Sequence, residues 1–164
     1  KNMGPAGTVM YAFDTEAVGK TGRSIPSYLD LQVHASKDSM FNTPSVFPVY
    51  VTMLTLRWIK SMGGVKAMEE RNARKAALIY GEIDRNELFE GHAEGTSRST
   101  MNATFRLKDD TNAAAFDILW KEAGISGIKG HRSVGGYRAS MYNALPEESV
   151  QVLVDVMKEL ERTA

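Results

Sequence analysis

The stretch Gly130-His131-Arg132-Ser133-Val134-Gly135-Gly136-Tyr137-Arg138-Ala139-Ser140 lies between two runs that are typical of β-strands. It brings two arginines and a histidine together with three glycines. Arginine presents a planar fork of donors that matches carboxylate and phosphate oxygens, and glycine lets the backbone turn sharply next to a ligand. The stretch therefore predicts a strand–turn–strand unit that binds a small anion. A solvated turn with surface ion pairs is the alternative.

The residues around this stretch indicate a small α/β unit. Alternation over residues 101–105 predicts a strand, and helical spacing predicts helices over 111–123 and from Pro146 onward. Short strands are expected over 125–129 and 137–142. We therefore expect a C-terminal domain over residues 96–164 that packs against the part formed by residues 1–95.

The preceding part is predicted to contain a buried strand over residues 8–13 and two helices. One helix follows Ser39-Met40-Phe41-Asn42-Thr43-Pro44 and ends near Met62, at Gly63-Gly64. It is apolar nearly all round, which is typical of a buried helix. The other helix, over residues 65–83, has one apolar face. Residues 21–38 and 86–97 are expected to be irregular.

The composition limits the classes of function. The chain has 164 residues, of which 20 are basic and 20 acidic, and it has no cysteine. Nucleic-acid and membrane surfaces need a basic excess, so neither partner is expected. Without cysteine there is no disulfide framework and no thiolate zinc site, and no metal site is predicted. No apolar run is long enough to span a membrane, which favours a cytoplasmic protein.

The chain begins with Lys1-Asn2-Met3-Gly4-Pro5-Ala6-Gly7. Together with the segment 39–44 and the segment 130–140, this segment resembles the phosphoserine aminotransferase family. The resemblance covers essentially the whole chain and implies its fold, which is the C-terminal part of a fold-type I pyridoxal-phosphate transferase. Residues 1–95 would be the end of the large cofactor domain, and residues 96–164 the small α/β domain.

The resemblance also implies a reaction and its residues. The enzyme would exchange an amino group between glutamate and 3-phosphohydroxypyruvate to give O-phospho-L-serine. Lys1 would form the Schiff base with pyridoxal 5′-phosphate, and Asn42 and Thr43 would bind the cofactor phosphate across a homodimer interface. His131 and Arg132 would bind the side-chain phosphate or carboxylate of the substrate, and Arg138 its α-carboxylate.

Two other interpretations remain at this point. The lysine turn does not by itself fix the substrate, so another small-molecule class V aminotransferase is possible. A non-catalytic fragment that binds anions or supports dimerisation is the other. The family's ring-stacking aromatic and the aspartate for the pyridinium nitrogen are expected upstream of Lys1, so the 164 residues alone are predicted to be inactive.

Overall fold

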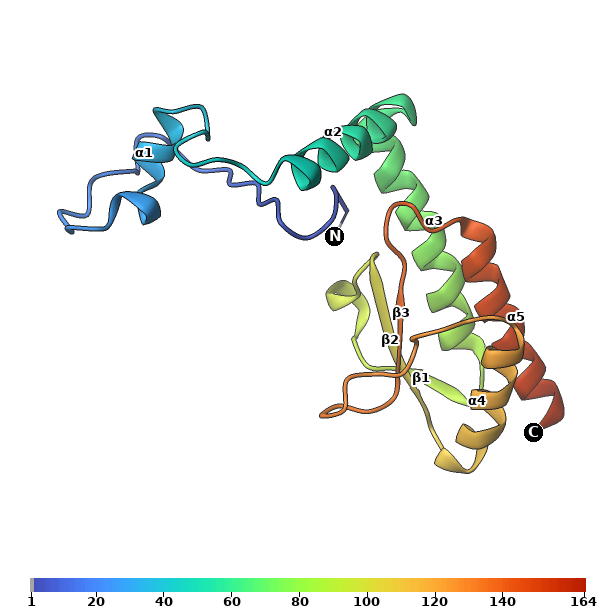
Figure 1. The fold of residues 1–164 in the computed structure, drawn as a ribbon. Coiled ribbons are helices and arrows are strands. Elements are labelled where there is room, and N and C mark those ends of the chain that lie inside the picture. The colour runs from blue at the N-terminus through green and yellow to red at the C-terminus, as the bar shows by residue number, and fades with distance from the viewer. Residues whose placement is uncertain (1) are drawn as a thin grey trace. The chain divides into compact units, whose positions relative to one another are not determined.

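A computed structural model of the chain describes residues 2–164 and divides into two units (Figure 1). Unit 1 contains residues 3–58, and unit 2 contains residues 59–164 together with Asn2. This division lies well before residue 95, the boundary predicted from the sequence. The physical reason is that the helix over residues 64–85 packs on the C-terminal sheet. How the two units correspond to the domains of a complete transferase remains a prediction.

Unit 2 is built on a three-stranded antiparallel sheet in the order β1-β2-β3. Its strands are β1 (Phe89–Gly91), β2 (Asn102–Leu107) and β3 (Tyr137–Ser140). Phe89 pairs with Leu107, and Phe105 pairs with Tyr137. Three helices pack on one face of this sheet: α3 (Gly64–Arg85), α4 (Ala113–Glu122) and α5 (Glu147–Thr163) (Figure 1). Polar residues of the strands occupy the other face.

The core of unit 2 is centred on an aromatic cluster. Phe116 of α4 packs edge-on against Phe89, with ring centroids 5.0 Å apart, and against Tyr137, at 4.8 Å. Phe105 stacks on Tyr137 from the neighbouring strand. The alternation in β2 places Ala103, Phe105 and Leu107 in this core. The apolar sides of α3 and α5 complete it.

The sequence predicted the helices of unit 2 well. The expected helices over 65–83 and 111–123 correspond to α3 and α4, and the helix after Pro146 corresponds to α5. One predicted strand and one segment predicted to be irregular were wrong. Residues 125–129 form an extended segment with a single bridge, Lys129 to Tyr137, and β1 lies inside the segment 86–97 that was expected to be irregular. Both segments are too short for their periodicity to identify them.

Unit 1 has little regular structure apart from helix α2 (Val46–Ser61), whose last residues belong to unit 2. A short helix, α1 (Leu31–Ala35), occurs where an irregular segment was expected. Single 3₁₀ turns lie at Ser27–Leu29 in this unit, and at Gly95–Ser97 and Asp110–Asn112 in unit 2. Asp38 and Ser39 both have positive φ angles, which produces a sharp bend at the start of the segment 39–44.

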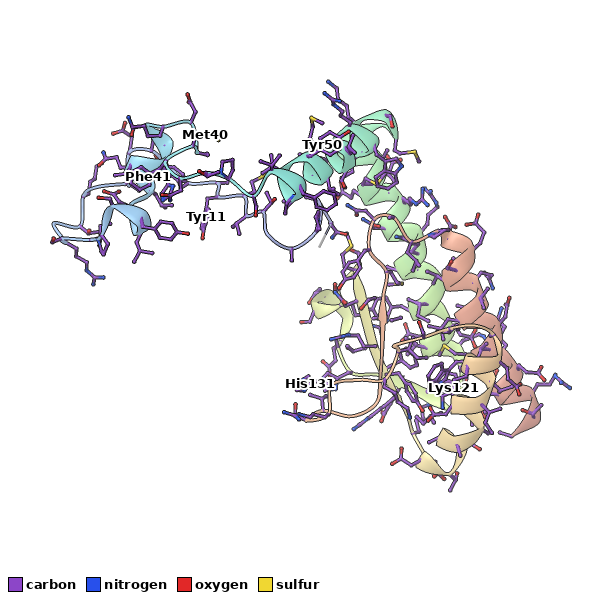
Figure 2. All side chains as sticks on the ribbon, in the orientation of Figure 1. Tyr11, Met40, Phe41, Tyr50, Lys121 and His131 are labelled. Atoms are coloured by element: carbon purple, nitrogen blue, oxygen red, sulfur yellow. The ribbon has the colours of Figure 1, made fainter. Side chains whose placement is uncertain are left out.

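The strand predicted over residues 8–13 is not formed. A strand needs a neighbour for its backbone hydrogen bonds, and no segment among the described residues pairs with this one. Its apolar side chains are exposed, among them Val9, Met10 and Tyr11. Helix α2 is also exposed, and none of its described residues is buried. Figure 2 labels Tyr11, Met40, Phe41 and Tyr50, four of the exposed apolar side chains of unit 1.

Among the described residues, no helix has both the length and the apolar character needed to cross a bilayer. Helix α2 is the most apolar helix, and it includes Arg57 and Lys60.

Candidate functional site

Lys1, the residue predicted to carry the cofactor, lies outside the described residues. The structure describes the rest of its motif. Gly4 packs directly on α2, where a Cβ atom at this position would lie 2.4 Å from Oγ1 of Thr52. This contact is far too short for any side chain, so the close approach of the two segments requires glycine at position 4.

Unit 1 brings the first two motifs to one cavity of about 270 Å³. Met3 and Gly4 line it from the first segment, Thr8 from the residue that follows this segment, and Ser39 and Thr52 from the second segment and α2. The hydroxyl oxygen of Thr8 is buried and has no hydrogen-bond partner among the described residues. A buried hydroxyl without a partner is costly, so this cavity provides a polar group that a bound ligand could satisfy.

Asn42 and Thr43 lie in the exposed segment immediately before α2. Their side chains supply an amide and a hydroxyl donor, and the first turn of a helix has backbone N–H groups without intrahelical partners. Phosphate binds well to such a set, because the helix dipole and neutral donors both favour an anion. The chemistry of these donors fits the phosphate of pyridoxal phosphate. Pro48, at the third position of α2, is tolerated because it needs no N–H there.

In unit 2, His131 and Arg132 lie on a tight loop between Gly130 and Gly136. The N–H of Gly130 donates to the carbonyl of Gly136 at 2.8 Å. A Cβ atom on Gly130 would lie 2.0 Å from the carbonyl oxygen of Gly135. Glycine is therefore required at the base of this loop, as the sequence indicated. Figure 2 shows His131 at the outer end of the loop.

The ring of His131 is oriented by Ser133. The backbone N–H of Ser133 donates to Nδ1 of His131 at 3.3 Å, and the hydroxyl of Ser133 lies 2.7 Å from the same nitrogen. With Nδ1 accepting, the proton of the neutral ring lies on Nε2, where it can be donated to an anion. Arg132 is exposed and forms no ion pair with a carboxylate of the described chain. Both side chains are therefore available to a ligand.

His131 and Arg132 line a cavity of about 640 Å³ together with several charged side chains. Arg106, Lys108 and Lys129 also line it, together with the carboxylates of Glu90 and Asp110, and none of these five was predicted from the sequence. Arg106 is held by an ion pair with Glu90 at 2.6 Å. The alternation of β2 could have identified Arg106, because it places this residue on the polar face of the sheet. The four lysine and arginine side chains of the lining outnumber its two carboxylates, so the cavity favours an anionic ligand.

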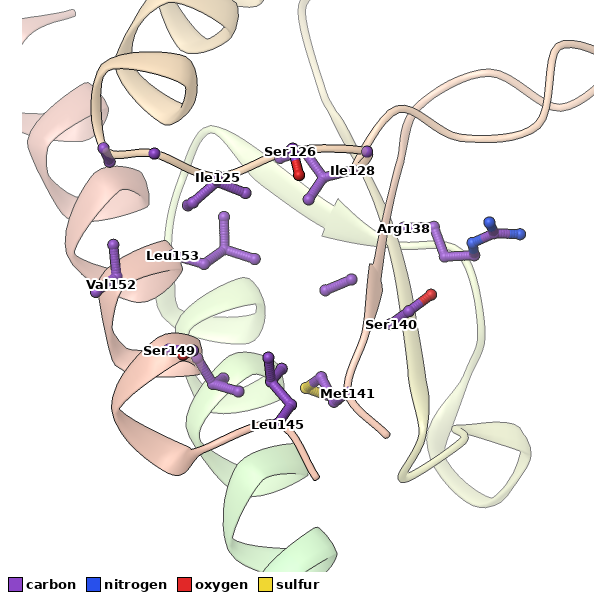
Figure 3. Close-up of a pocket in the computed structure, with 15 residues that line it drawn as sticks. Ile125, Ser126, Ile128, Arg138, Ser140, Met141, Leu145, Ser149, Val152 and Leu153 are labelled. Atoms are coloured by element: carbon purple, nitrogen blue, oxygen red, sulfur yellow. The ribbon is translucent and has the colours of Figure 1, made fainter. Parts of the chain in front are cut away.

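Arg138 lies elsewhere in unit 2. It is on β3, opposite Thr104 of β2, and its side chain is exposed on the open face of the sheet. Arg138 lines a different cavity, of about 360 Å³, whose apolar lining includes Ile125 and Leu153. Figure 3 shows the guanidinium of Arg138 directed away from these two residues. Arg138 thus lines a different cavity from the one that His131 and Arg132 line.

Asp117 of α4 fixes the strand and the segment that lead into the loop. Its carboxylate accepts from the Trp120 indole and from the Tyr137 hydroxyl, both at 3.1 Å, and pairs with Lys129 at 2.5 Å. Burial favours the neutral acid, but the hydrogen bonds from Lys129, Trp120 and Tyr137 outweigh burial and lower the pKa of Asp117. Burial, and then the nearby Asp117 carboxylate, raises the pKa of Tyr137.

A pH prediction follows for Asp117. A carboxyl whose pKa is lower in the folded state than in the unfolded state stabilises the folded protein at pH values above the unfolded pKa, which is about 4. This stabilisation is lost as the pH falls through the pKa of the folded state. We therefore expect Asp117→Asn to unfold more easily at pH 7 and to lose less further stability than the unchanged protein between about pH 4 and pH 2. Urea unfolding at several pH values measures the free energy of unfolding of both proteins. An equal loss of this free energy between about pH 4 and pH 2 in both proteins would contradict the prediction.

Comparisons with known proteins show the family of the chain. The model of the family described as aminotransferase class-V matches residues 1–153. Phosphoserine aminotransferases of Flavobacterium psychrophilum and Flavobacterium johnsoniae are 61% and 62% identical to the chain over 161 residues. These matches cover 98% of the chain and 45% of each relative. The chain therefore spans about half the length of the curated relatives it matches.

Solved structures give the same result. A phosphoserine aminotransferase structure that describes radiation damage of the Schiff base matches 92% of the chain and 42% of its own length, with a TM-score of 0.84 and 38% identity. The enzyme of Bacillus circulans subsp. alkalophilus matches 85% of the chain and 39% of its own length, with a TM-score of 0.79 and 39% identity. A pyridoxal-phosphate-bound enzyme from Trichomonas vaginalis matches 82% of the chain and 39% of its own length at a TM-score of 0.74 and 36% identity. The predicted fold class, part of a fold-type I transferase, is confirmed.

Proposed function

Because the chain belongs to the class-V aminotransferase family, we propose that it forms part of a phosphoserine aminotransferase. This enzyme would transfer an amino group between glutamate and 3-phosphohydroxypyruvate to give O-phospho-L-serine, a cytoplasmic step of serine biosynthesis. The observation that carries the substrate assignment is the cavity that His131 and Arg132 share with the cationic side chains of Arg106, Lys108 and Lys129. Such a site favours a substrate with a second anionic group besides its α-carboxylate.

The cofactor we propose is pyridoxal phosphate, which supplies an electron sink for the bonds at the substrate Cα when it is bound. Lys1 would hold it covalently, while Asn42, Thr43 and the first turn of α2 bind its phosphate. Once free, the amine of Lys1 would carry the proton between the substrate Cα and the C4′ atom of the cofactor. That role requires an amine that can lose its proton, which burial or a neighbouring cation promotes by lowering its pKa.

The substrate-binding residues would bind different groups of the substrate. His131, through Nε2–H, and Arg132 would bind the side-chain phosphate of phosphoserine or the side-chain carboxylate of glutamate. Arg138 would bind the α-carboxylate that every amino-acid substrate has. The separation of Arg138 from the His131 loop in unit 2 supports two different ligand groups.

We also propose that the complete enzyme is a homodimer whose active sites are shared between subunits. The exposed apolar side chains of α2 need a cover in water, which a second subunit or the rest of the enzyme would supply. Val46 and Phe47 are 71% and 72% exposed in the isolated chain.

Arginine substitutions test the substrate assignment in the full-length protein. We expect Arg132→Ala to lower kcat/KM for phosphoserine far more than for an unphosphorylated amino acid, and Arg138→Ala to lower it for both. A lost charge-assisted hydrogen bond costs roughly 1.5–3 kcal/mol, or about ten- to a hundredfold. The measurement is steady-state transamination with each amino donor.

Arg162→Ala is the matched control, since Arg162 is an exposed arginine on α5 that pairs with Glu159. It should leave both substrates unaffected. If Arg132→Ala and Arg138→Ala each lowered kcat/KM equally for both substrates, the proposed division between phosphate and α-carboxylate would be wrong. Activity of the unchanged protein with hydroxypyruvate but not with its phosphate would favour another class V aminotransferase.

A further inference from the structure

Asn2, the neighbour of the proposed cofactor lysine, is held by unit 2. Its side-chain oxygen accepts a hydrogen bond from the backbone N–H of Asn143 at 3.1 Å. Its amide nitrogen lies 3.7 Å from the sulfur of Met101, a weak acceptor. Asn2 is half-buried. Both partners lie at ends of the sheet, since Met101 precedes β2 and Asn143 follows β3.

The segment that presents Asn143 is fixed from α3. The ammonium of Lys75 donates to the carbonyls of Met141, Tyr142 and Leu145 at 3.1, 2.7 and 3.2 Å. Lys75 is fully buried, and burial lowers the pKa of its amine, followed by the repulsion from Arg71. A buried cation is tolerated here because three carbonyl dipoles replace water around it. The connection from β3 to α5 is thereby immobilised at three points.

The side chain of Asn143 is fixed by a second residue of α3. The amide nitrogen of Asn72 donates to Oδ1 of Asn143 at 2.8 Å, and Asn72 is only 4% exposed. Asn72 therefore orients the residue whose N–H holds Asn2. The result is a continuous path of hydrogen bonds from α3 through Asn143 to the side chain next to Lys1.

We infer that Asn2 is a positioning residue for Lys1, and that Asn72 acts through it. The inference rests on the proposed function, in which Lys1 carries pyridoxal phosphate. Consecutive Cα atoms are about 3.8 Å apart, so fixing Asn2 restricts where the amine of Lys1 can reach. Small displacements of a reacting group reduce rates strongly, and an attack of the amine on the cofactor aldehyde depends on this position.

The test measures how fast the full-length protein, stripped of cofactor, becomes yellow on mixing with pyridoxal phosphate. We expect Asn2→Ala and Asn72→Ala each to slow this step on the order of tenfold, while the final amount of bound cofactor remains near one per site. Asn2→Asp keeps an oxygen that can accept from the N–H of Asn143, and it should slow the step less than Asn2→Ala. Because Asn72 acts through Asn2, the double variant Asn2→Ala with Asn72→Ala should be no slower than Asn2→Ala alone.

Asn112→Ala is the matched control, because the Asn112 side chain makes no capping hydrogen bond to α4. It should leave the rate unchanged. Unchanged rates in Asn2→Ala and Asn72→Ala would overturn the inference, as would equal losses in the alanine and aspartate variants. If Asn2→Ala does not fold, the comparison of Asn72→Ala with Asn2→Asp decides, because Asn72→Ala should be the slower of the two.

Borohydride fixation and peptide mass spectrometry separate this inference from the proposed function. Fixation of the cofactor at Lys1 in the unchanged protein supports the function, whatever the rates in the variants. Fixation at another lysine would reject the function and the inference together. Fixation at Lys1 with unaltered rates in the variants would reject the inference alone.

Discussion

Lys1→Ala in the full-length protein is expected to lose the yellow absorbance of the bound cofactor and nearly all transamination. The reason is that one amine is proposed both to hold pyridoxal phosphate and to move the proton at the substrate Cα. Removal of a residue with both roles lowers kcat by several orders of magnitude, because no other group takes over the proton transfer. Visible absorbance and a transamination assay measure the two losses.

Lys20→Ala is the control for this experiment. Lys20 is an exposed lysine that pairs with Glu16, so its loss should change neither readout. Borohydride fixation of the cofactor at an unchanged level in Lys1→Ala would show that another lysine carries it. The assignment of Lys1 would then be wrong.

The second large effect concerns the 164 residues by themselves, which should show no transamination and should self-associate. The relatives are more than twice as long as the part that the chain matches. By the resemblance, the group that stacks on the cofactor ring and the partner of its pyridinium nitrogen lie outside this part. The apolar side chains of α2 and of residues 9–13 are exposed in the isolated chain, and Val65 at the start of α3 is 81% exposed. Uncovered apolar surface of this extent drives association in water.

Size-exclusion chromatography with light scattering, followed by an assay with added pyridoxal phosphate, tests this expectation. Replacing Val46 and Phe47 by serine should reduce association of the isolated chain, because these two side chains are among its most exposed apolar ones. Ile118→Ser on α4 is a matched control from outside this surface, at 56% exposure, and should change association little. A soluble monomer with measurable turnover would contradict the prediction.

The sequence predicted those parts of the fold whose contacts lie within unit 2. The helical spacing of α3, α4 and α5 is long enough to be read without the structure, and the alternation in β2 identified its buried face. The glycines of the 130–136 loop were also correctly interpreted, since each is needed by a close contact in that loop or by a positive φ angle. These features depend on local periodicity and backbone geometry.

The remaining features depend on partners that local patterns do not reveal. Residues 8–13 have the composition of a strand, but a strand forms only beside another, and the described chain has no neighbour for it. Strand β1 has three residues and is recognised only through its pairing with β2. Lys75 is on a helix with many charged residues, and its complete burial follows from three carbonyls that come from a distant segment.

The two faces of the sheet in unit 2 have different consequences for evolution. On the helix-covered face, the side chains of Phe105 and Tyr137 interlock with Phe116, so a change of volume there requires compensating changes. On the open face, Arg106 lines the cavity of His131 and Arg132 but contributes little to the core, so it can be exchanged without repacking the core. The preference of such a scaffold for one amino acid over another can therefore drift within a lineage while its melting temperature stays nearly constant.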